Sequence, residues 1–111
     1  MYIPHATIEG IMNSKIFEKI VGFEWDEGNK IKNLTKHKVS QDECEETFFD
    51  PSREVQKDLL HSIGEERYIL LGYTKYKRLL YIVFTIRNTK IRVISARDIN
   101  KKERKLYEEK N

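Results

Sequence analysis

Two apolar segments that alternate with polar residues, and that only two residues separate, constrain the fold more than any other feature. The first runs from Leu79 to Arg87, the second from Lys90 to Arg97, and Asn88-Thr89 lies between them. A period of two is typical of β-strands, and asparagine tolerates the left-handed backbone of a tight turn, although threonine is a poor second turn residue. The pattern predicts a β-hairpin with these register pairs: Ile86–Ile91, Phe84–Val93, Thr85–Arg92 and Arg87–Lys90.

The predicted hairpin has two different faces, because successive strand side chains point in opposite directions. The face that we expect to pack on helices carries only apolar residues: Leu80, Ile82, Phe84, Ile86, Ile91 and Val93. The other face is mixed and carries Tyr81, Val83, Thr85, Arg87, Lys90, Arg92 and Ile94. The period of two also predicts a weak strand over 53–57 and a stronger one over 68–73.

Helix signals lie on both sides of these strands. Asp26 follows the alternating Phe23-Glu24-Trp25, which predicts an edge strand and then a helix to about Lys36 that buries Ile31 and Leu34. Ser40 and Glu43 have the spacing of a capping box, and Asp50-Pro51 ends the helix that this box begins. The other expected features are a staple of Val39 with Cys44, an inward Phe48, and a last helix capped by Asn100 with Glu103 that holds Leu106 and Tyr107.

Length and composition indicate one small globular domain. The chain has 111 residues, of which 39% are hydrophobic and 35% charged, and one core is usual at this size. No apolar run approaches the roughly 20 residues that span a bilayer, and the N-terminus lacks the pattern of a signal peptide, so we expect a cytoplasmic protein without a membrane partner. Cys44 is the only cysteine, which excludes a disulfide within the chain and favours a packing role.

Charge is unevenly distributed along the chain. Residues 75–105 contain eleven Lys and Arg and two acidic residues, whereas residues 41–66 contain nine acidic residues and two basic ones. The basic half is a candidate phosphate-binding surface, and the acidic half would repel phosphates. Charges placed only for solubility would give the same totals.

Several motifs occur in one order along the chain: Phe23-Glu24-Trp25-Asp26, Lys36-His37-Lys38-Val39-Ser40, His61-Ser62-Ile63-Gly64-Glu65-Glu66-Arg67, Thr85-Ile86-Arg87, Ile91-Arg92-Val93-Ile94-Ser95-Ala96-Arg97 and Glu103-Arg104-Lys105-Leu106-Tyr107. In this order and spacing they resemble the BrnT family of type II toxins, ribonucleases of the RelE-like superfamily. The resemblance implies an α+β fold, a small antiparallel sheet with helices packed on one face. It places the toxin domain at 23–111, and leaves 1–22 as an N-terminal extension for which an amphipathic helix is a candidate.

The resemblance also implies a function. A BrnT-like protein is expected to be an endoribonuclease that inhibits translation and growth and is neutralised by a cognate BrnA-like antitoxin. Operator DNA would be bound only through the complex with that antitoxin. Two other interpretations remain open: a non-catalytic nucleic-acid-binding module that uses the basic hairpin, and a protein-interaction module that uses the acidic helix.

Cleavage of RNA through its own 2′-hydroxyl requires proton transfer and positive charge on the phosphorane. Arginine suits the second task, because its planar fork binds phosphate oxygens in pairs and stays charged. The family pattern, with Arg67 after paired acids, Arg87 after Thr85, Arg97 after Ser95-Ala96 and Tyr107 after Glu103-Arg104, supports the arginines better than any acid or base. The candidate catalytic residues are Arg67, Arg87, Arg97, Glu66, His61 and Tyr107, and the candidate RNA-binding residues are Lys75, Lys77, Arg78, Lys90 and Arg92.

Each candidate has a plainer alternative. Any one arginine can be a surface charge paired with Glu65, Glu66 or Asp98, and His61 can belong to a solvated turn. Three scattered histidines and one cysteine show no ligand spacing, and the isolated glycines form no phosphate loop. The sequence therefore predicts neither a metal site nor a cofactor, and the identity of the RNA target is not readable from it.

Overall fold

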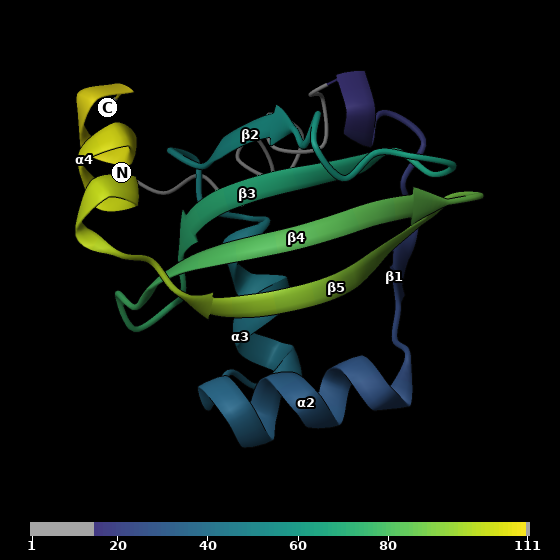
Figure 1. The fold of residues 1–111 in the computed structure, drawn as a ribbon, viewed down its shortest axis with the longest axis horizontal. Coiled ribbons are helices and arrows are strands. Elements are labelled where there is room, and N and C mark those ends of the chain that lie inside the picture. Colours follow the sequence, from purple (N-terminus) through teal and green to yellow (C-terminus); the bar gives the residue numbers. More distant parts are fainter. Residues whose placement is uncertain (1–14, 111) are drawn as a thin grey trace.

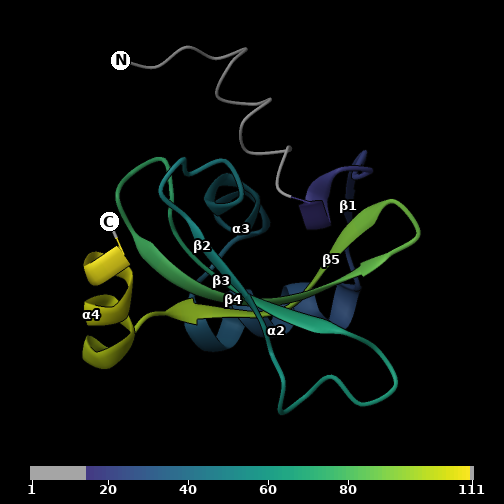
Figure 2. The same ribbon diagram turned by 90° about the horizontal axis from the view of Figure 1, so that it is seen from above.

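The computed structural model describes residues 15–110, which form one sheet with helices on both sides (Figures 1 and 2). The expected helix within residues 1–22 lies for the most part outside the described residues. The elements in chain order are η1 (Lys15–Phe17), β1 (Gly22–Glu24), α2 (Glu27–His37), α3 (Gln41–Thr47), β2 (Glu54–Lys57), β3 (Arg67–Tyr73), β4 (Leu79–Arg87), β5 (Lys90–Asp98) and α4 (Lys101–Lys110).

The sheet has five strands in the order β1-β5-β4-β3-β2. All neighbours are antiparallel except β1, which pairs with β5 in parallel as an edge strand. The predicted hairpin is confirmed with its register, since β4 and β5 pair Ile86 with Ile91 and Phe84 with Val93, and Asn88 has the left-handed φ of 57° that the turn needs. The α+β class predicted from the sequence is confirmed.

One irregularity interrupts the hairpin and changes which side chains share a face. Phe84 pairs with Val93, but the preceding Val83 pairs with Ser95, so Ile94 is an extra residue on β5. Such a bulge shifts the alternation by one position. Simple alternation would put Arg97 on the face of Val93, whereas in the structure Arg97 pairs with Tyr81 and shares its face.

The face of the sheet that carries Phe84 is covered and forms the main core. Helix α3 lies behind this face in Figure 1 and contributes Cys44, with Phe48 directly after it. Phe17 is also buried there, stacked on Phe84 with 5.9 Å between ring centroids. Part of the predicted extension therefore packs into the core. The remaining buried members are Val39, Leu70, Leu80, Ile82, Ile91, Val93 and Ala96.

Helix α2 differs from the prediction in the face that it buries. Ile31 and Leu34 are 58% and 53% exposed, and Asn33 is the buried residue. The reason is a backbone hydrogen bond. Strand β1 pairs only with the first residues of β5, so the backbone N–H of Ala96 needs an acceptor from another element. The side-chain oxygen of Asn33 accepts this hydrogen bond at 3.2 Å. The prediction that α2 buries Ile31 and Leu34 is wrong.

The predicted helix starts are confirmed. The Asp26 carboxylate accepts from the Asn29 amide at 3.0 Å, and Ser40 with Glu43 forms the complete capping box. At α4 the side chains of Asn100 and Glu103 each accept from the other residue's backbone amide, at 2.8 and 2.9 Å. These local bonds satisfy amides that the first turn of a helix leaves unpaired.

The opposite face of the sheet is open over most of its area. Helix α4 covers one end of it, where Tyr107 is buried with Ile69, Leu71 and Leu79 in a second, smaller cluster. No helix among the described residues is long and apolar enough to cross a membrane. The candidate site residues on the strands lie between α4 and the hairpin turn.

Gly72 offers a test of how closely α3 packs on the sheet. An added Cβ at this position would lie 2.9 Å from the Thr47 carbonyl oxygen, which is backbone and has little freedom to move. We expect Gly72→Ala to lower the free energy of unfolding by about 1–3 kcal/mol, measured by urea denaturation. Gly22→Ala is the matched control, because a Cβ there meets nothing within 4 Å, and an equal loss in both variants would contradict the close packing.

Candidate functional site

Three residues on adjacent strands form a row across the open face. Arg67 on β3 pairs with Thr85 on β4, and Thr85 pairs with Arg92 on β5, so the three side chains leave the same face. Neighbouring positions are about 5 Å apart, which puts the Cα atoms of Arg67 and Arg92 about 10 Å apart. Arg87 lies two residues beyond Thr85, about 7 Å along β4. We call Arg67, Arg87 and Arg92 the arginine cluster.

A carboxylate lies among these guanidinium groups. Glu65 accepts from Arg87 Nε at 2.7 Å and from Arg87 Nη2 at 3.3 Å. The pKa of the Glu65 carboxyl is lowered from its ordinary 4.5, chiefly by the hydrogen bond from Arg87; burial opposes this shift, and the charges of Arg87, Arg67 and Arg92 add to it. All three arginines of the cluster therefore act on one anionic group.

The members of the arginine cluster differ in how they are held. Arg92 is gripped by Glu24 at 3.0 Å and Asp26 at 2.8 Å, and its side chain is 21% exposed. Arg87 is more exposed and pairs with Glu65 alone among the described carboxylates. Arg67 is half-buried, and no ion pair joins it to a carboxylate in residues 15–110. Arg67 is thus the least neutralised of the three.

The loop between β2 and β3 holds a histidine paired with a buried acid. His61 Nδ1 lies 3.0 and 3.2 Å from the two oxygens of Asp58, a residue that is only 8% exposed. The loop is closed at Arg67, whose backbone oxygen accepts from the Asp58 amide at 2.8 Å and whose amide donates to Ser62 Oγ at 3.0 Å. His61 is therefore fixed next to the strand that carries Arg67. In the neutral imidazole Nδ1 donates to Asp58, and Nε2 keeps its lone pair.

Arg97 lies at the other end of the open face. Its guanidinium stacks 4.0 Å above the Tyr81 ring and donates to both oxygens of Glu103 on α4, at 2.9 and 2.8 Å. Tyr81 is four residues from Thr85, so about 13 Å separate this stack from the row across the sheet. The structure thus divides the predicted arginines into two places on one face.

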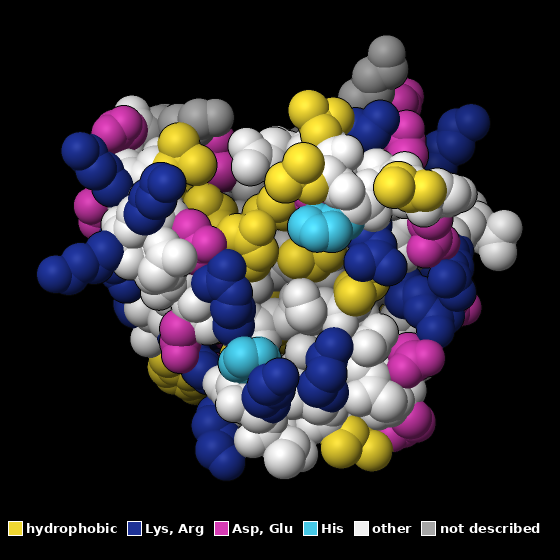
Figure 3. Space-filling view, in the orientation of Figure 1, with side chains coloured by type: hydrophobic (Ala, Val, Ile, Leu, Met, Phe, Trp, Pro, Cys, Tyr) yellow, Lys and Arg dark blue, Asp and Glu magenta, His cyan; other side chains and the backbone are white. Residues whose placement is uncertain are grey.

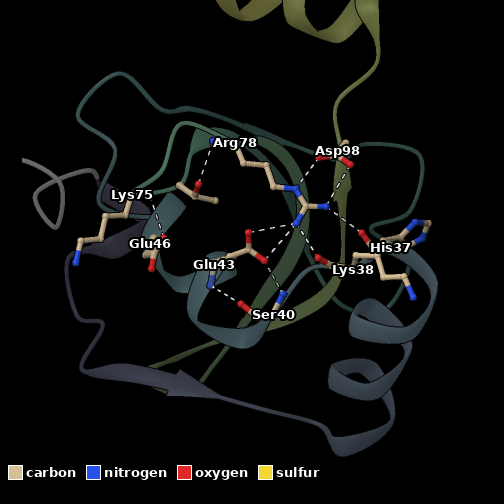
Figure 4. A network of polar contacts seen from close by, with 9 residues as sticks. His37, Lys38, Ser40, Glu43, Glu46, Lys75, Arg78 and Asp98 are labelled. Carbon is tan, nitrogen blue, oxygen red and sulfur yellow. Dashed lines mark hydrogen bonds and ion pairs between the residues drawn. The ribbon is translucent and has the colours of Figure 1, made fainter.

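Arg78, a predicted RNA-binding residue, is bonded inside the protein (Figure 4). Its guanidinium donates to Glu43 at 3.2 Å, to Asp98 at 2.7 Å, and to the backbone oxygens of His37 and Lys38 at 3.0 and 2.7 Å. These contacts join the end of α2, the start of α3 and the end of β5. Arg78 therefore joins parts of the fold, and its predicted contact with RNA stays a prediction.

Two predicted catalytic residues also have structural roles. The Glu66 carboxylate accepts from Lys57 and Tyr68, both at 2.9 Å, and Tyr68 lies on the covered face. Tyr107 is 4% exposed and donates to Asp50 at 2.9 Å; burial first, and then Asp50, raise the pKa of its hydroxyl. Both side chains therefore have partners within the fold, and their proton-transfer roles stay predictions.

The remaining basic candidates lie at the two ends of the sheet. Lys90 is exposed at the hairpin turn and pairs in register with Arg87. Lys75 and Lys77 lie in the β3–β4 turn, beside an open pocket of about 880 Å³ lined also by Phe49, Tyr73 and Tyr107. This pocket contains no member of the arginine cluster.

Figure 3 shows the open face from the side of α4 and the β2–β3 loop. Hydrophobic side chains line a hollow in its middle, and Lys and Arg side chains lie on both sides of it. Residues 15–110 contain no group of three His, Cys, Asp or Glu that could hold a metal ion. The candidate functional groups on this face are the guanidinium groups of the arginines and the imidazole of His61.

The sequence did not reveal the Asp58–His61 pair, the place of Glu65 beside the arginine cluster, or the stack of Arg97 on Tyr81. Asp58 lies three residues before His61, a separation that a turn can close, so the pair had a weak sequence signal. For Glu65 the sequence indicates only a neutralising partner of an arginine. Tyr81 faces Arg97 only because of the bulge at Ile94, and the alternation of residues carries no sign of it.

Comparisons with known proteins agree with this geometry. Residues 25–103 match the family described as "Ribonuclease toxin, BrnT, of type II toxin-antitoxin system". Among solved structures, the crystal structure of the Brucella abortus ribonuclease toxin BrnT is similar, with a TM-score of 0.57 and 20% sequence identity over 73% of this chain and 99% of that one. No curated protein matches the sequence.

The fold and the site define a small α+β protein that carries a cluster of arginines and a histidine on an open sheet face. The family match covers most of the chain, and the chain belongs to the BrnT family of ribonuclease toxins of type II toxin-antitoxin systems. It is an endoribonuclease toxin, with RNA as its target and an antitoxin as its partner.

The Arg78 network generates a prediction about stability and pH. The pKa of Asp98 is lowered from 3.8, chiefly by the hydrogen bond from Arg78, and that of Glu43 from 4.5, where bonds from Ser40 and Arg78 overcome the opposite effect of burial. Carboxyls with lowered pKa values stabilise the fold above their unfolded pKa, and this stabilisation is lost as pH falls through the folded pKa.

We therefore expect Arg78→Ala to cost about 2 kcal/mol of unfolding free energy at pH 7 and less as the pH approaches 3. Urea denaturation across that range measures both. Lys75→Ala is the control, because it removes a neighbouring positive charge that, among the described residues, forms no ion pair with Glu43 or Asp98. A loss of stability that does not change with pH would show that Arg78 acts only through packing and its two backbone acceptors.

Proposed function

We propose that this toxin cuts RNA without a metal ion, by attack of the RNA 2′-hydroxyl, at the arginine cluster on the open sheet face. The observation that carries the proposal is the position of Glu65. Its carboxylate is bonded to Arg87 and feels the charges of Arg67 and Arg92. A phosphodiester is also an anion with two free oxygens, and it would suit the same three cations.

Replacement of Glu65 by RNA is energetically reasonable. The Arg87 and Glu65 side chains are 47% and 35% exposed, and exposed ion pairs contribute only about 0–1 kcal/mol. Arg67, which has no carboxylate partner of its own among the described residues, adds charge that the protein leaves unused. As the phosphorane forms, its extra negative charge strengthens the attraction to all three guanidinium groups, which is the requirement for catalysis.

His61 is the general base in this proposal, and Asp58 is its positioning residue. The Nδ1–H bond to Asp58 leaves Nε2 to take the proton of the 2′-hydroxyl. The 2′-oxygen then bonds to the adjacent phosphorus, and the bond to the 5′-oxygen breaks. The leaving oxygen takes a proton from water, which the open face admits. The products are a 2′,3′-cyclic phosphate and a 5′-hydroxyl end.

The other candidates act around this centre. We propose that Arg97, stacked on Tyr81, binds the RNA chain away from the cut, and that Lys90 adds positive charge near the hairpin turn. Lys75 and Lys77 lie far along the sheet and would contact only longer substrates. Arg92 belongs to the cluster and is held in place there by Glu24 and Asp26.

The finer identity of the partners is also a proposal. The antitoxin is of the BrnA type, and the toxin meets operator DNA only while bound to it. Cleavage takes place in the cytoplasm and stops growth by removing RNA needed for translation. The family membership supports each of these points through its type II toxin-antitoxin character.

The absence of a metal requirement and the role of His61 can be tested together. We expect the purified toxin to cut single-stranded RNA in EDTA at an undiminished rate and to leave 2′,3′-cyclic phosphate ends, identified by mass spectrometry. His61→Ala should lower kcat at least about 100-fold, as loss of a general base does. His37→Ala is the control and should keep activity; loss of cleavage in EDTA would contradict the mechanism.

Two substitutions with opposite effects on RNA binding can test whether the phosphate of RNA takes the place of the Glu65 carboxylate. Arg67→Ala should lower kcat/KM at least about tenfold, whereas Glu65→Gln should lower KM, because it removes the competing negative charge and keeps the side-chain shape. Arg104→Ala, an exposed arginine on α4, controls for the loss of one positive charge. If Glu65→Gln weakened RNA binding as Arg67→Ala does, Glu65 would be a support of the site and not the occupant of the phosphate position.

A further inference from the structure

The β2–β3 loop buries the acidic side chain of Asp58 and exposes three large apolar side chains. Leu59, Leu60 and Ile63 are 80%, 82% and 93% exposed, while Asp58 is buried. The reverse arrangement is the usual one in globular proteins. Three large apolar side chains within five residues form a patch of the kind that marks an interaction site.

The loop is held in this arrangement by its own hydrogen bonds. The Ser62 hydroxyl donates to the Asp58 carbonyl at 2.5 Å and accepts from the Arg67 amide at 3.0 Å. The Asp58 amide donates to the Arg67 carbonyl, and the Asp58 carboxylate bonds to His61. These hydrogen bonds fix the conformation of the loop, and this conformation leaves the three apolar side chains exposed.

Positive charge lies directly beside this apolar patch. Gly64 joins the patch to Glu65, which is bonded to Arg87, and the loop closes on Arg67. A partner that covers Leu59, Leu60 and Ile63 would extend over the arginine cluster. It would be bound best if it carried carboxylates at that edge, since these could pair with the guanidinium groups.

We propose that Leu59, Leu60 and Ile63 are the docking surface for the antitoxin. The occupant is an amphipathic segment whose apolar face covers the three side chains and whose acidic residues face the arginine cluster. This inference rests on the proposed function, because it takes the cluster and His61 as the site to be silenced. A segment in this position lies over His61 Nε2 and over the phosphate position at once.

Neutralisation then requires no change in the toxin's fold. The same loop carries the general base and the docking side chains, so the antitoxin blocks catalysis by occupying the loop that RNA must approach. The arginines exchange one anionic partner for another, from Glu65 to the carboxylates of the antitoxin. The bound toxin is inactive because the antitoxin occupies the site that RNA would bind.

The test measures binding and cleavage separately. The probe is the purified antitoxin encoded beside the toxin gene, and its Kd is measured by calorimetry against wild type, Leu59→Ser/Leu60→Ser and Ile63→Ser. We expect Kd to rise at least about 30-fold in the double variant, as for loss of residues that dominate an interface. Cleavage of RNA by each free variant should stay within about twofold of wild type, and circular dichroism checks the fold.

Ile31→Ser/Leu34→Ser on α2 is the matched control, because it removes two exposed apolar side chains elsewhere. It should leave Kd unchanged. The proposal is overturned if the loop variants bind the antitoxin as wild type does, if only the α2 variant loses affinity, if the loop variants lose RNA affinity instead, or if they only dissociate a toxin dimer in light scattering. A wild-type protein that binds antitoxin through the loop but cuts no RNA would reject the proposed function alone.

Discussion

The antiparallel pairing of β4 with β5 is the constraint on which the rest of the molecule depends. Its apolar face provides most of the core against which α3, Phe17 and Phe48 pack, and its other face carries the candidate site. The extra residue Ile94 affects both faces of this hairpin. It leaves the core side continuous from Val93 to Ala96 and brings Arg97 onto the open face beside Tyr81.

The sequence predicted those parts of the fold that depend on near neighbours. The caps at Asp26 and Ser40 and the turn at Asn88 are decided within a few residues, and they occur as expected. The orientation of α2 was not predictable in this way. Ile31 and Leu34 suggested a buried apolar stripe, but an unpaired amide at Ala96, sixty-three residues away, makes Asn33 the inward residue.

The candidate site shows a similar division. The motif pattern indicated the arginines, and counting along the strands placed Arg87 and Arg92 on one face, yet the total charge of the basic segment overstated what is free for RNA. Arg78 and Arg92 each hold carboxylates from distant elements, and Arg97 holds Glu103 from the helix that follows its strand. The ion pairs of Arg92 with Glu24 and Asp26 form because β1 lies beside β5. No local sequence pattern predicts this pairing of strands. The same holds for the partnership of Glu65 with the arginine cluster.

The position of Phe17 shows how far the folded domain extends ahead of the residues that match the family. The family match starts at residue 25, but the Phe17 ring fills space between Phe48 and Phe84, with centroids 6.0 and 5.9 Å away. A shortened chain that started at the match would leave a ring-sized void beneath the central strands, and voids of that size are among the most destabilising defects known. Phe17, which precedes the matched residues, is thus part of the core, and a domain boundary drawn from similarity alone would exclude it.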